Sequence, residues 1–543
     1  MSINLGPIKL DSRQVIRQLQ RDLRDDWFPD SLRYEDIFSN DHIESVLTEN
    51  FSRNNGIYQP SERQLLNIPK SNLTLRYALE TSIVDRAIYH GLTASLVPYF
   101  DPLIPWNVFS HRYAEKKDGR YLFKQPIKAW QDFTGTARES LATAPVLLST
   151  DLSNYFENIS TTQLKESLLN RLGALTCDAN DKATIRSSID LLFSYLSFWS
   201  HHKDKGLPQN RDASSFLANM YMLPIDEYMC RAGYRYFRYM DDIKIICADE
   251  YEARAALKHL SLELRKLGLS INSGKTKITH ADDAAAIADC LDAGSHELQE
   301  IAASWDTRRL LTISRTLPSL RERVLRILKD GLVDTREFRY YVRRLRALAT
   351  CPEFEVPPDY FLPISDRIVE EIPRYPAATD QLVTYLKSVD LNGNHLSSIS
   401  TYLCDGKRSI YNWQNYRLWQ LVTHKHYRDE RLIQLSKELV KSDQDTPSRS
   451  GATLYLGALG DDDGRIHVAK HFHLAKSFLG QRNGLVAVHC LSFTPLIAEH
   501  VAPHVRDDLR NVYRHLHRDP RGYTMPDEPI SITSILDMER SYE

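Results

Sequence analysis

The chain has 543 residues, which is too long for one compact core and suggests two to four domains. Hydrophobic residues make up 42% of it and charged residues 26%, a composition that excludes a disordered or fibrous protein. The formal net charge of -2 excludes a globally basic protein, so any surface that binds nucleic acid must be local.

The first residues, MSINLGPIKLDSRQ, lack an apolar signal core. No stretch approaches the roughly 20 consecutive apolar residues that span a bilayer. We therefore expect a cytoplasmic protein that does not bind a membrane. The seven cysteines have no C-x-x-C spacing, which argues against a zinc module or a disulfide framework.

The N-terminal part is charged and carries apolar residues at helical spacing, among them Val15 and Leu19. This pattern predicts a helical lead-in over residues 1–60. In residues 61–280, short apolar runs such as PVLLSTDL alternate with helical stretches such as FLANMYMLPIDEYM. That alternation predicts an α+β fold.

Strand-like runs become scarce in the second half, residues 281–543. Segments such as RERVLRILKD and DERLIQLSKELVK have apolar residues three and four apart, which predicts an all-α domain with sub-boundaries near residues 355 and 447. The small residues of GATLYLGALG are typical of helix pairs in HEAT-like solenoids, although no strict repeat period is present.

Two strand-like segments end in carboxylates. The run RYMDDIKII carries Asp241 and Asp242, and its aromatic and β-branched residues favour a hairpin. A YxDD pattern alone also fits a solvated turn. However, the apolar run PVLLST ends in Asp151, 90 residues before Asp241, so three carboxylates can converge at adjacent strand ends.

Nucleotidyl transfer requires such a cluster, because two Mg²⁺ ions about 4 Å apart hold the triphosphate and activate the primer hydroxyl. Mg²⁺ prefers hard oxygen ligands, which explains carboxylates rather than His or Cys. We predict two Mg²⁺ ions per active site, with Mn²⁺ as a substitute, on Asp151, Asp241, Asp242 and the backbone carbonyl of Leu152.

Five segments resemble, in order, the fingers and palm of bacterial and group II intron reverse transcriptases. They cover about 210 residues and are the run from IPKSNLTLR to NVFSHR at 68–112, DLSNYF at 151–156, GLPQNRDASSFLANMYM at 206–222, RYMDD at 238–242 and LGLSINSGKTKI at 267–278. The resemblance implies a reverse transcriptase fingers and palm domain over residues 61–280. It also implies that the protein makes DNA from dNTPs.

The same resemblance assigns roles to two cations and an aromatic residue. Lys70 and Arg76 would grip the β- and γ-phosphates of the nucleotide, where cations neutralise developing charge. An exposed charged loop is the alternative. Phe156 would be the aromatic gate that crowds a ribose 2′-hydroxyl, and a core phenylalanine is the compatible alternative.

Four further residues follow from the matched segments. Gln209 and Tyr239 would lie beside the nucleotide, and Lys275 would donate a proton to the leaving pyrophosphate unless it is merely solvated. Asn210 stands where the family has a glycine, which adds a side chain where the backbone approaches nucleotide or template. We therefore expect unusual template handling.

Beyond Lys277 we find neither the family's primer-gripping hairpin nor its three-helix thumb. Together with the helical second half, this resembles the abortive-infection and antiphage-defence class of bacterial reverse transcriptases. That class implies a homo-oligomer that binds RNA or a single-stranded DNA product, in some members with a dedicated noncoding RNA. Template use and the primer stay open.

Residues 301–350 hold twelve Lys or Arg against five acids. They are the strongest candidate for a surface that tracks phosphates, with Tyr340 and Tyr341 stacking on bases. A solvated helix face with internal ion pairs explains the same residues equally well.

Two alternatives to a defence-type DNA polymerase remain. The first is an RNA-templated reverse transcriptase of the intron-maturase kind, against which the missing thumb argues. The second is a catalytically silent scaffold that binds nucleic acid. A silent scaffold has no need to retain the carboxylates together with Lys70, Arg76 and Gln209.

Overall fold

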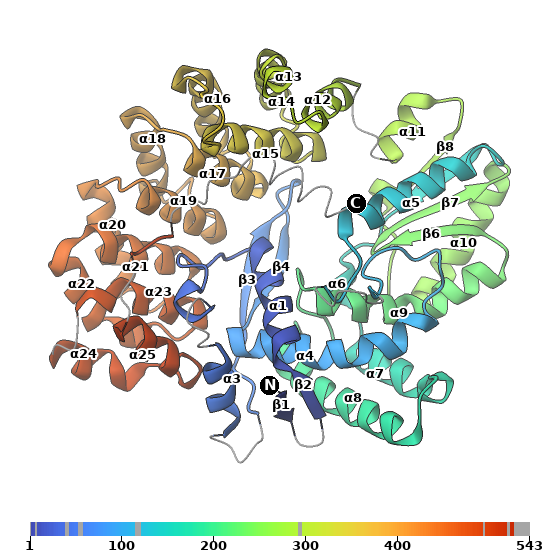
Figure 1. The fold of residues 1–543 in the computed structure, drawn as a ribbon, viewed down its shortest axis with the longest axis horizontal. Helices are drawn as coiled ribbons and strands as arrows, with labels where there is room; N and C mark the ends of the chain where they lie inside the picture. Colours follow the sequence, from blue (N-terminus) through green and yellow to red (C-terminus); the bar gives the residue numbers. More distant parts are fainter. Residues whose placement is uncertain are drawn as a thin grey trace.

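The structure is a computed structural model (Figure 1). It describes residues 2–5, 8–38, 43–52, 58–114, 121–291, 296–491, 495–518 and 522–525. None of the helices in these ranges combines the length and the apolar content that crossing a bilayer demands.

The N-terminal part contains helices, as expected, but it begins with an antiparallel hairpin that was not predicted. Its helix α1 is capped by Asp11, whose carboxylate accepts hydrogen bonds from the backbone of Arg13 and Gln14. One face of α1 is buried and includes Val15 and Leu19. The elements are β1 (Ser2–Leu5), β2 (Ile8–Asp11), α1 (Ser12–Asp22), α2 (Glu35–Phe38) and α3 (Ile43–Ser52).

A second antiparallel hairpin, β3 (Gln64–Pro69) and β4 (Leu75–Glu80), forms what we call the fingers hairpin. The long helix α4 (Ile83–Phe100) follows it and is buried along most of its length. Ser82 and Asp85 form a capping box that fixes the start of α4.

The palm sheet has four antiparallel strands in the order β6-β7-β5-β8. Helix α5 packs on one face, and α9 and α10 pack on the other (Figure 1). Because both faces are covered, successive residues of a strand are all buried: Leu147 packs in the α5 layer and Leu148 in the opposite layer. The elements are α5 (Pro126–Ser140), β5 (Val146–Thr150), α6 (Tyr155–Asn158), α7 (Thr161–Asn170), α8 (Ala179–Trp199), α9 (Asp212–Arg231), β6 (Arg235–Tyr239), β7 (Asp242–Cys247), α10 (Glu250–Lys266), β8 (Lys277–His280) and α11 (Ala284–Cys290).

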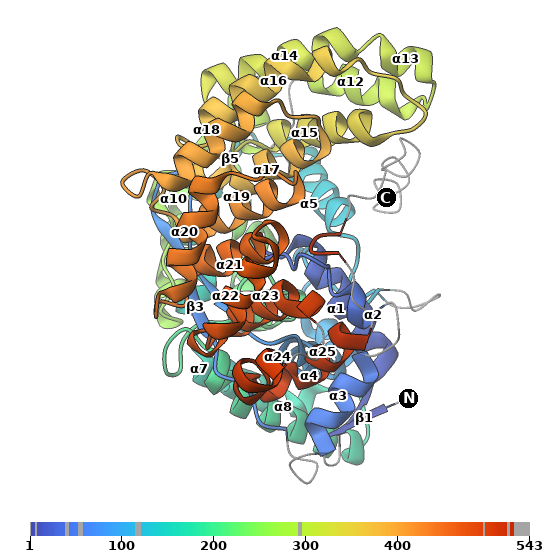
Figure 2. The same ribbon diagram turned by 90° about the vertical axis from the view of Figure 1, so that its left-hand side faces the viewer.

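In the described residues after His280, every regular element is helical. From α14 onward, each helix packs against the helix two places further along the chain, so even-numbered and odd-numbered helices form two rows. Figures 1 and 2 show these rows as an arc with the fingers hairpin on its concave side. The helices are α12 (His296–Asp306), α13 (Leu310–Ser314), α14 (Leu317–Asp330), α15 (Arg336–Thr350), α16 (Pro358–Glu371), α17 (Thr379–Ser388), α18 (Gly393–Cys404), α19 (Asn412–His424), α20 (Glu430–Lys441), α21 (Pro447–Leu459), α22 (Asp461–Lys470), α23 (Phe478–Val488), α24 (Pro495–His500) and α25 (Arg510–Arg518).

The odd-numbered helices form the inner row of the arc, next to the fingers hairpin (Figure 1). Glycines permit the close packing of α21 on α19 and α23, its two neighbours in this row. A Cβ added at Gly451 would lie 2.7 Å from the Cβ of Trp419 on α19, and one added at Gly457 would lie 2.5 Å from the Cβ of Ala487 on α23. The small residues singled out in the sequence therefore serve helix contact.

The arc contacts the fingers and also residues 27–36, which run from the loop after α1 into α2. Trp413 of α19 donates to the backbone carbonyl of Trp27 at 2.8 Å. Arg482 of α23 is buried and donates to both carboxylate oxygens of Asp30 and of Asp36, at 2.7 to 2.9 Å. Apolar side chains of the fingers hairpin, among them Ile68, pack against α19 in the same region.

We predict that Arg482→Ala lowers the free energy of unfolding by about 3–5 kcal/mol, because it leaves two carboxylates buried without their partner. Urea unfolding followed by circular dichroism measures the change. Arg510→Ala is the matched control, since Arg510 forms an exposed ion pair with Asp507, and its removal should cost at most about 1 kcal/mol. Equal effects of the two variants would contradict the role assigned to Arg482.

Candidate active site

The register of the palm sheet brings the three expected carboxylates to one end of the sheet. Strand β5 pairs with β7 so that Thr150 lies opposite Ile243. Asp151 follows Thr150 directly, and Asp242 precedes Ile243, so the two carboxylates lie at neighbouring strand ends. Asp241 occupies the two-residue turn of the β6–β7 hairpin, in which Tyr239 pairs with Asp242.

That turn is held by buried polar groups. Met240 has a positive φ of 55°, and its backbone N–H donates to the hydroxyl of Ser110 at 3.1 Å. Beneath the turn, the fully buried guanidinium of Arg238 donates to the carbonyl of Met240 at 3.0 Å and to both carboxylate oxygens of Asp226 on α9. The arginine of the RYMDD segment therefore supports the turn instead of facing solvent.

The three carboxylates repel one another. Burial, together with the charges of Asp151 and Asp242, raises the pKa of Asp241 to about 7. The ammonium of Lys275 lies 2.8 Å from Oδ2 of Asp151, and the side chain of Asp151 is only 9% exposed. Although burial opposes its charge, the hydrogen bond and ion pair with Asp151 raise the pKa of Lys275. The expected proton donor thus contacts one of the three carboxylates directly.

The chemistry of this donor set fits a divalent cation, because hard oxygen ligands whose mutual repulsion raises a pKa are stabilised by positive charge. In the described part of the chain, no three His, Cys, Asp or Glu side chains are arranged so that they could hold a metal ion as they stand. The ammonium of Lys275 lies against Asp151 instead. The backbone at Leu152 is set by flanking bonds from Asn272 to the carbonyl of Asp151 and from Ser153 to that of Ser270.

The fingers hairpin carries its two expected cations to this end of the palm. The Lys70 ammonium donates to the side-chain oxygen of Asn154 at 3.0 Å, three residues after Asp151. Burial lowers the pKa of Arg76, while the charges of Asp241 and Glu157 oppose that shift. Both cations are therefore close to the carboxylate end of the sheet.

Hydrogen bonds join the segment around Phe156, the expected aromatic gate, to residues 207–210, which include the PQN segment (208–210). Phe156 is half-buried against the core, and its carbonyl accepts from the backbone of Leu207 at 3.0 Å. Gln209 donates to the carboxylate of Glu157 at 3.3 Å. Asn210 has a φ of 57°, the left-handed conformation that glycine adopts freely and asparagine tolerates best among other residues. This explains how asparagine can stand in the place of glycine.

Tyr239 is anchored by its neighbours. Its hydroxyl donates to the carbonyl of Pro126 at 3.3 Å, and its ring lies edge-on to Trp130 with 5.0 Å between centroids. The guanidinium of Arg336, at the start of α15, lies 5.9 Å from the centre of the Trp130 ring. The helical half therefore reaches across to the palm beside the β6–β7 hairpin.

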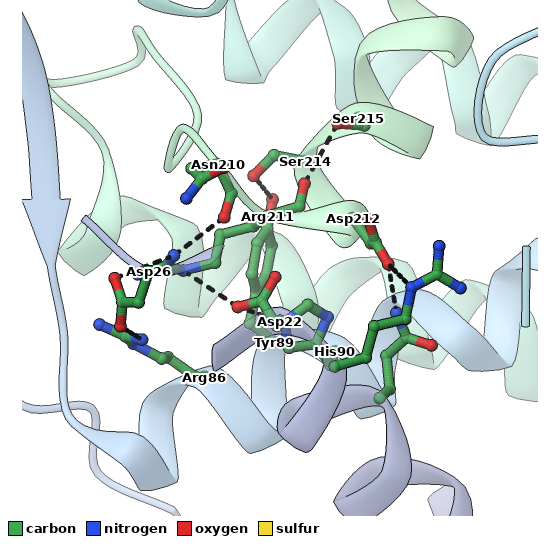
Figure 3. A network of polar contacts seen from close by, with 12 residues as sticks. Asp22, Asp26, Arg86, Tyr89, His90, Asn210, Arg211, Asp212, Ser214 and Ser215 are labelled. Carbon is green, nitrogen blue, oxygen red and sulfur yellow. Dashed lines mark hydrogen bonds and ion pairs between the residues drawn. The ribbon is translucent and has the colours of Figure 1, made fainter. Parts of the chain in front are cut away.

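Behind the PQN segment lies a buried network of charges that the sequence analysis missed (Figure 3). Arg211 lies within 4.0 Å of Asp22, Asp26 and Glu80. Arg86 also pairs with Asp26 and Glu80. Burial is the main reason that the pKa of Glu80 rises to about 7. This network joins α1, α4 and the fingers hairpin to the loop that carries Gln209 and Asn210.

A signal for this network was present in the sequence. Asp22 continues the apolar stripe of Val15 and Leu19 at helical spacing, so it lies on the buried face of α1. Asp212, next to Arg211, accepts from Gln18 of the same face at 2.6 Å.

The arginine-rich segment is only partly the surface that we expected. Arg344 is buried, 3.9 Å from the centre of the Tyr340 ring, and Tyr341 is buried with its hydroxyl donating to Glu337 at 3.0 Å. The expectation that Tyr341 stacks on bases is wrong, because Tyr341 belongs to the apolar stripe of α15. Arg339 and Arg346 of the same helix line a large cleft, described below.

Residues 68–340 match the protein family described as reverse transcriptase (RNA-dependent DNA polymerase). The match spans just over half of the 543 residues. The chain belongs to this reverse transcriptase family. Polymerases of the family are nucleotidyltransferases that use divalent metal ions, nucleotides and RNA templates.

Two solved telomerases are similar to this reverse transcriptase at 11% identity. Apo telomerase from Candida tropicalis has a TM-score of 0.32, with 88% of this chain and 74% of that chain covered. Telomerase from Candida albicans, in complex with the TWJ fragment of telomeric RNA, has a TM-score of 0.30, with 69% and 70% covered. The comparison with curated proteins gives no match.

We predict that Asn210→Gly leaves the reverse transcriptase stable to within about 1 kcal/mol, because glycine adopts a positive φ freely. Asn210→Val should destabilise it by about 1–2 kcal/mol, since a β-branched residue is strained in the left-handed conformation. Thermal unfolding and nucleotide incorporation of both variants test this. A loss in the glycine variant as large as in the valine variant would mean that the asparagine side chain itself is required.

Proposed function

We propose that this reverse transcriptase is a DNA polymerase that joins dNTPs and acts in bacterial defence against phage. The observation that supports polymerisation most directly is the pairing of β5 with β7, since it puts Asp151 beside Asp241 and Asp242 at the end of the sheet. Lys70 and Arg76 of the fingers hairpin approach the same end.

The three carboxylates and the Leu152 carbonyl would hold two Mg²⁺ ions, or Mn²⁺ in their place, which when bound orient the triphosphate and make the primer hydroxyl more acidic. Lys70 and Arg76 would bind the β- and γ-phosphates and neutralise their charge. Lys275 would protonate the leaving pyrophosphate. Its side chain is 67% exposed, so it is accessible to a bound nucleotide.

Phe156, Gln209, Asn210 and Tyr239 would shape the nucleotide pocket. The hydrogen bond between Gln209 and Glu157, next to Phe156, supports a common pocket for the ribose and the base. Phe156 would exclude a 2′-hydroxyl by crowding it. The left-handed backbone at Asn210 turns the chain where template or nucleotide would approach.

The defence role rests on the resemblance of the sequence to the abortive-infection class and on the long helical half, which we propose to be a HEAT-like solenoid. Homo-oligomerisation, an RNA or single-stranded DNA partner, a dedicated noncoding RNA and a cytoplasmic location belong to the same proposal. Challenging bacteria that express the protein with phage tests the role. Wild type should protect and Asp241→Ala should not, and equal plaque numbers for the two would contradict it.

We predict that Asp151→Ala and Asp241→Ala each abolish incorporation of labelled dNTPs, because each removes an oxygen ligand that transition-state stabilisation requires. Incorporation is measured with and without added template, and melting temperatures verify the fold. Asp249→Ala, which removes a helix-capping carboxylate outside the site, is the control and should retain activity. Near-normal polymerisation by either site variant would overturn the assignment.

Phe156→Ala should admit ribonucleotides, because it relieves the crowding at the 2′-hydroxyl. The ratio of kcat/KM for a dNTP to that for the matching NTP should fall by at least tenfold, which corresponds to about 1.4 kcal/mol. If the ratio stays the same while both rates remain measurable, Phe156 does not contact the ribose.

A further inference from the structure

A large cleft separates the fingers from the inner row of helices. It has a volume of about 1120 Å³ and is enclosed by residues 20–38, the turn of the fingers hairpin, and helices α15, α17 and α19. We call it the basic cleft. It exceeds the roughly 300–1,000 Å³ of a typical small-molecule pocket, which favours an extended ligand.

The charges of the basic cleft favour an anion. Eight Lys or Arg and five Asp or Glu side chains line it. Asp26 and Asp30 pair with buried arginines outside the lining, and Asp380 pairs with Arg417 at 2.6 Å. The lining therefore carries three more cations than acids, and two of its acids already pair with arginines outside it. Because the net charge of the chain is -2, this excess of positive charge is local.

The arrangement of the cations suits a chain of phosphates. Arg339 and Arg346 lie two turns apart on α15, and Lys387 adds a third cation from α17. Trp27 is half-buried in the opposite wall, and the guanidinium of Arg76 lies 5.8 Å from the centre of its ring. A positive groove beside an aromatic side chain is the combination that binds single strands, since phosphates follow the cations and bases stack on the ring.

The basic cleft approaches the candidate active site at the turn of the fingers hairpin. Lys70 and Arg76 belong to its lining, yet Lys70 donates to Asn154 of the palm and the charge of Arg76 interacts with that of Asp241. A strand in the cleft would therefore reach the carboxylates at one end.

We propose that the basic cleft binds single-stranded nucleic acid and leads one end of it to Asp151, Asp241 and Asp242. This inference rests on the proposed polymerase function and names the surface that holds the strand. The helices of the second half would thereby take over strand binding, for which we found no thumb in the sequence.

The test is fluorescence anisotropy with end-labelled 20-nucleotide DNA and RNA single strands and a DNA duplex, without dNTPs. The double variant Arg339→Gln/Arg346→Gln should raise the single-strand Kd at least tenfold. The slope of log Kd plotted against log salt concentration should fall by about 1.4, since each of the two lost phosphate contacts contributes about 0.7 for a single strand. The matched control, Arg315→Gln/Lys329→Gln, neutralises two exposed cations outside the cleft and should bind like wild type.

Tighter binding of the DNA or of the RNA strand distinguishes a DNA product from an RNA partner, and either supports the proposal. An unchanged Kd in the cleft variant, equal weakening in the control, or preference for the duplex would overturn it. Asp241→Ala separates the two claims, because it should lose incorporation and keep strand binding. If wild type binds strands through the cleft but incorporates no dNTP, only the polymerase assignment fails. If wild type incorporates dNTPs and the cleft variant binds single strands as tightly as wild type, only the assignment of strand binding to the basic cleft fails.

Discussion

The antiparallel pairing of β5 with β7 is the constraint on which the rest of the site depends. Its register sets Asp151 beside Asp242, and the tight β6–β7 turn adds Asp241. Gathering three carboxylates costs free energy, as the raised pKa of Asp241 indicates. Two cations offset that cost: Lys275 from the palm and Arg76 from the fingers. Arg238 carries its own buried charge below the turn, where it pairs with Asp226 and fixes the backbone that presents Asp241.

A second set of buried charges joins the three parts of the chain. Four acidic residues from the end of α1 to α2 pair with arginines of two other parts of the chain. Asp22 and Asp26 pair with Arg211, beside the PQN segment of the palm loop. Asp30 and Asp36 pair with Arg482 of the helical arc. Because an unpaired buried charge is costly, these pairs specify how the fingers, the palm loop and the arc sit together. The basic cleft lies between the fingers and the arc, and residues 20–38 form part of its lining, so its shape depends on this short segment.

The sequence predicts the elements that have strong periodicity and misses the contacts between them. The run PVLLST and the RYMDD hairpin are strands, and the second half is helical, as their patterns predict. The β1–β2 hairpin escaped notice because its strands are only four residues long. Arg344 was expected at the surface, and the burial of Asp22 was not foreseen, because composition cannot show a distant partner. Tyr341 was misjudged although its spacing from Phe338 and Leu345 marks it as part of an apolar stripe.

The central claim is that Asp151, Asp241 and Asp242 together hold the divalent metal of a polymerase. Anomalous diffraction from crystals grown with Mn²⁺ and an unreactive dNTP analogue tests it most directly. We expect anomalous peaks within coordination distance of all three carboxylates, with the Lys275 ammonium moved from Asp151 toward the triphosphate. If Lys275 stays on Asp151 and no peak lies between the carboxylates at saturating Mn²⁺, the account is contradicted.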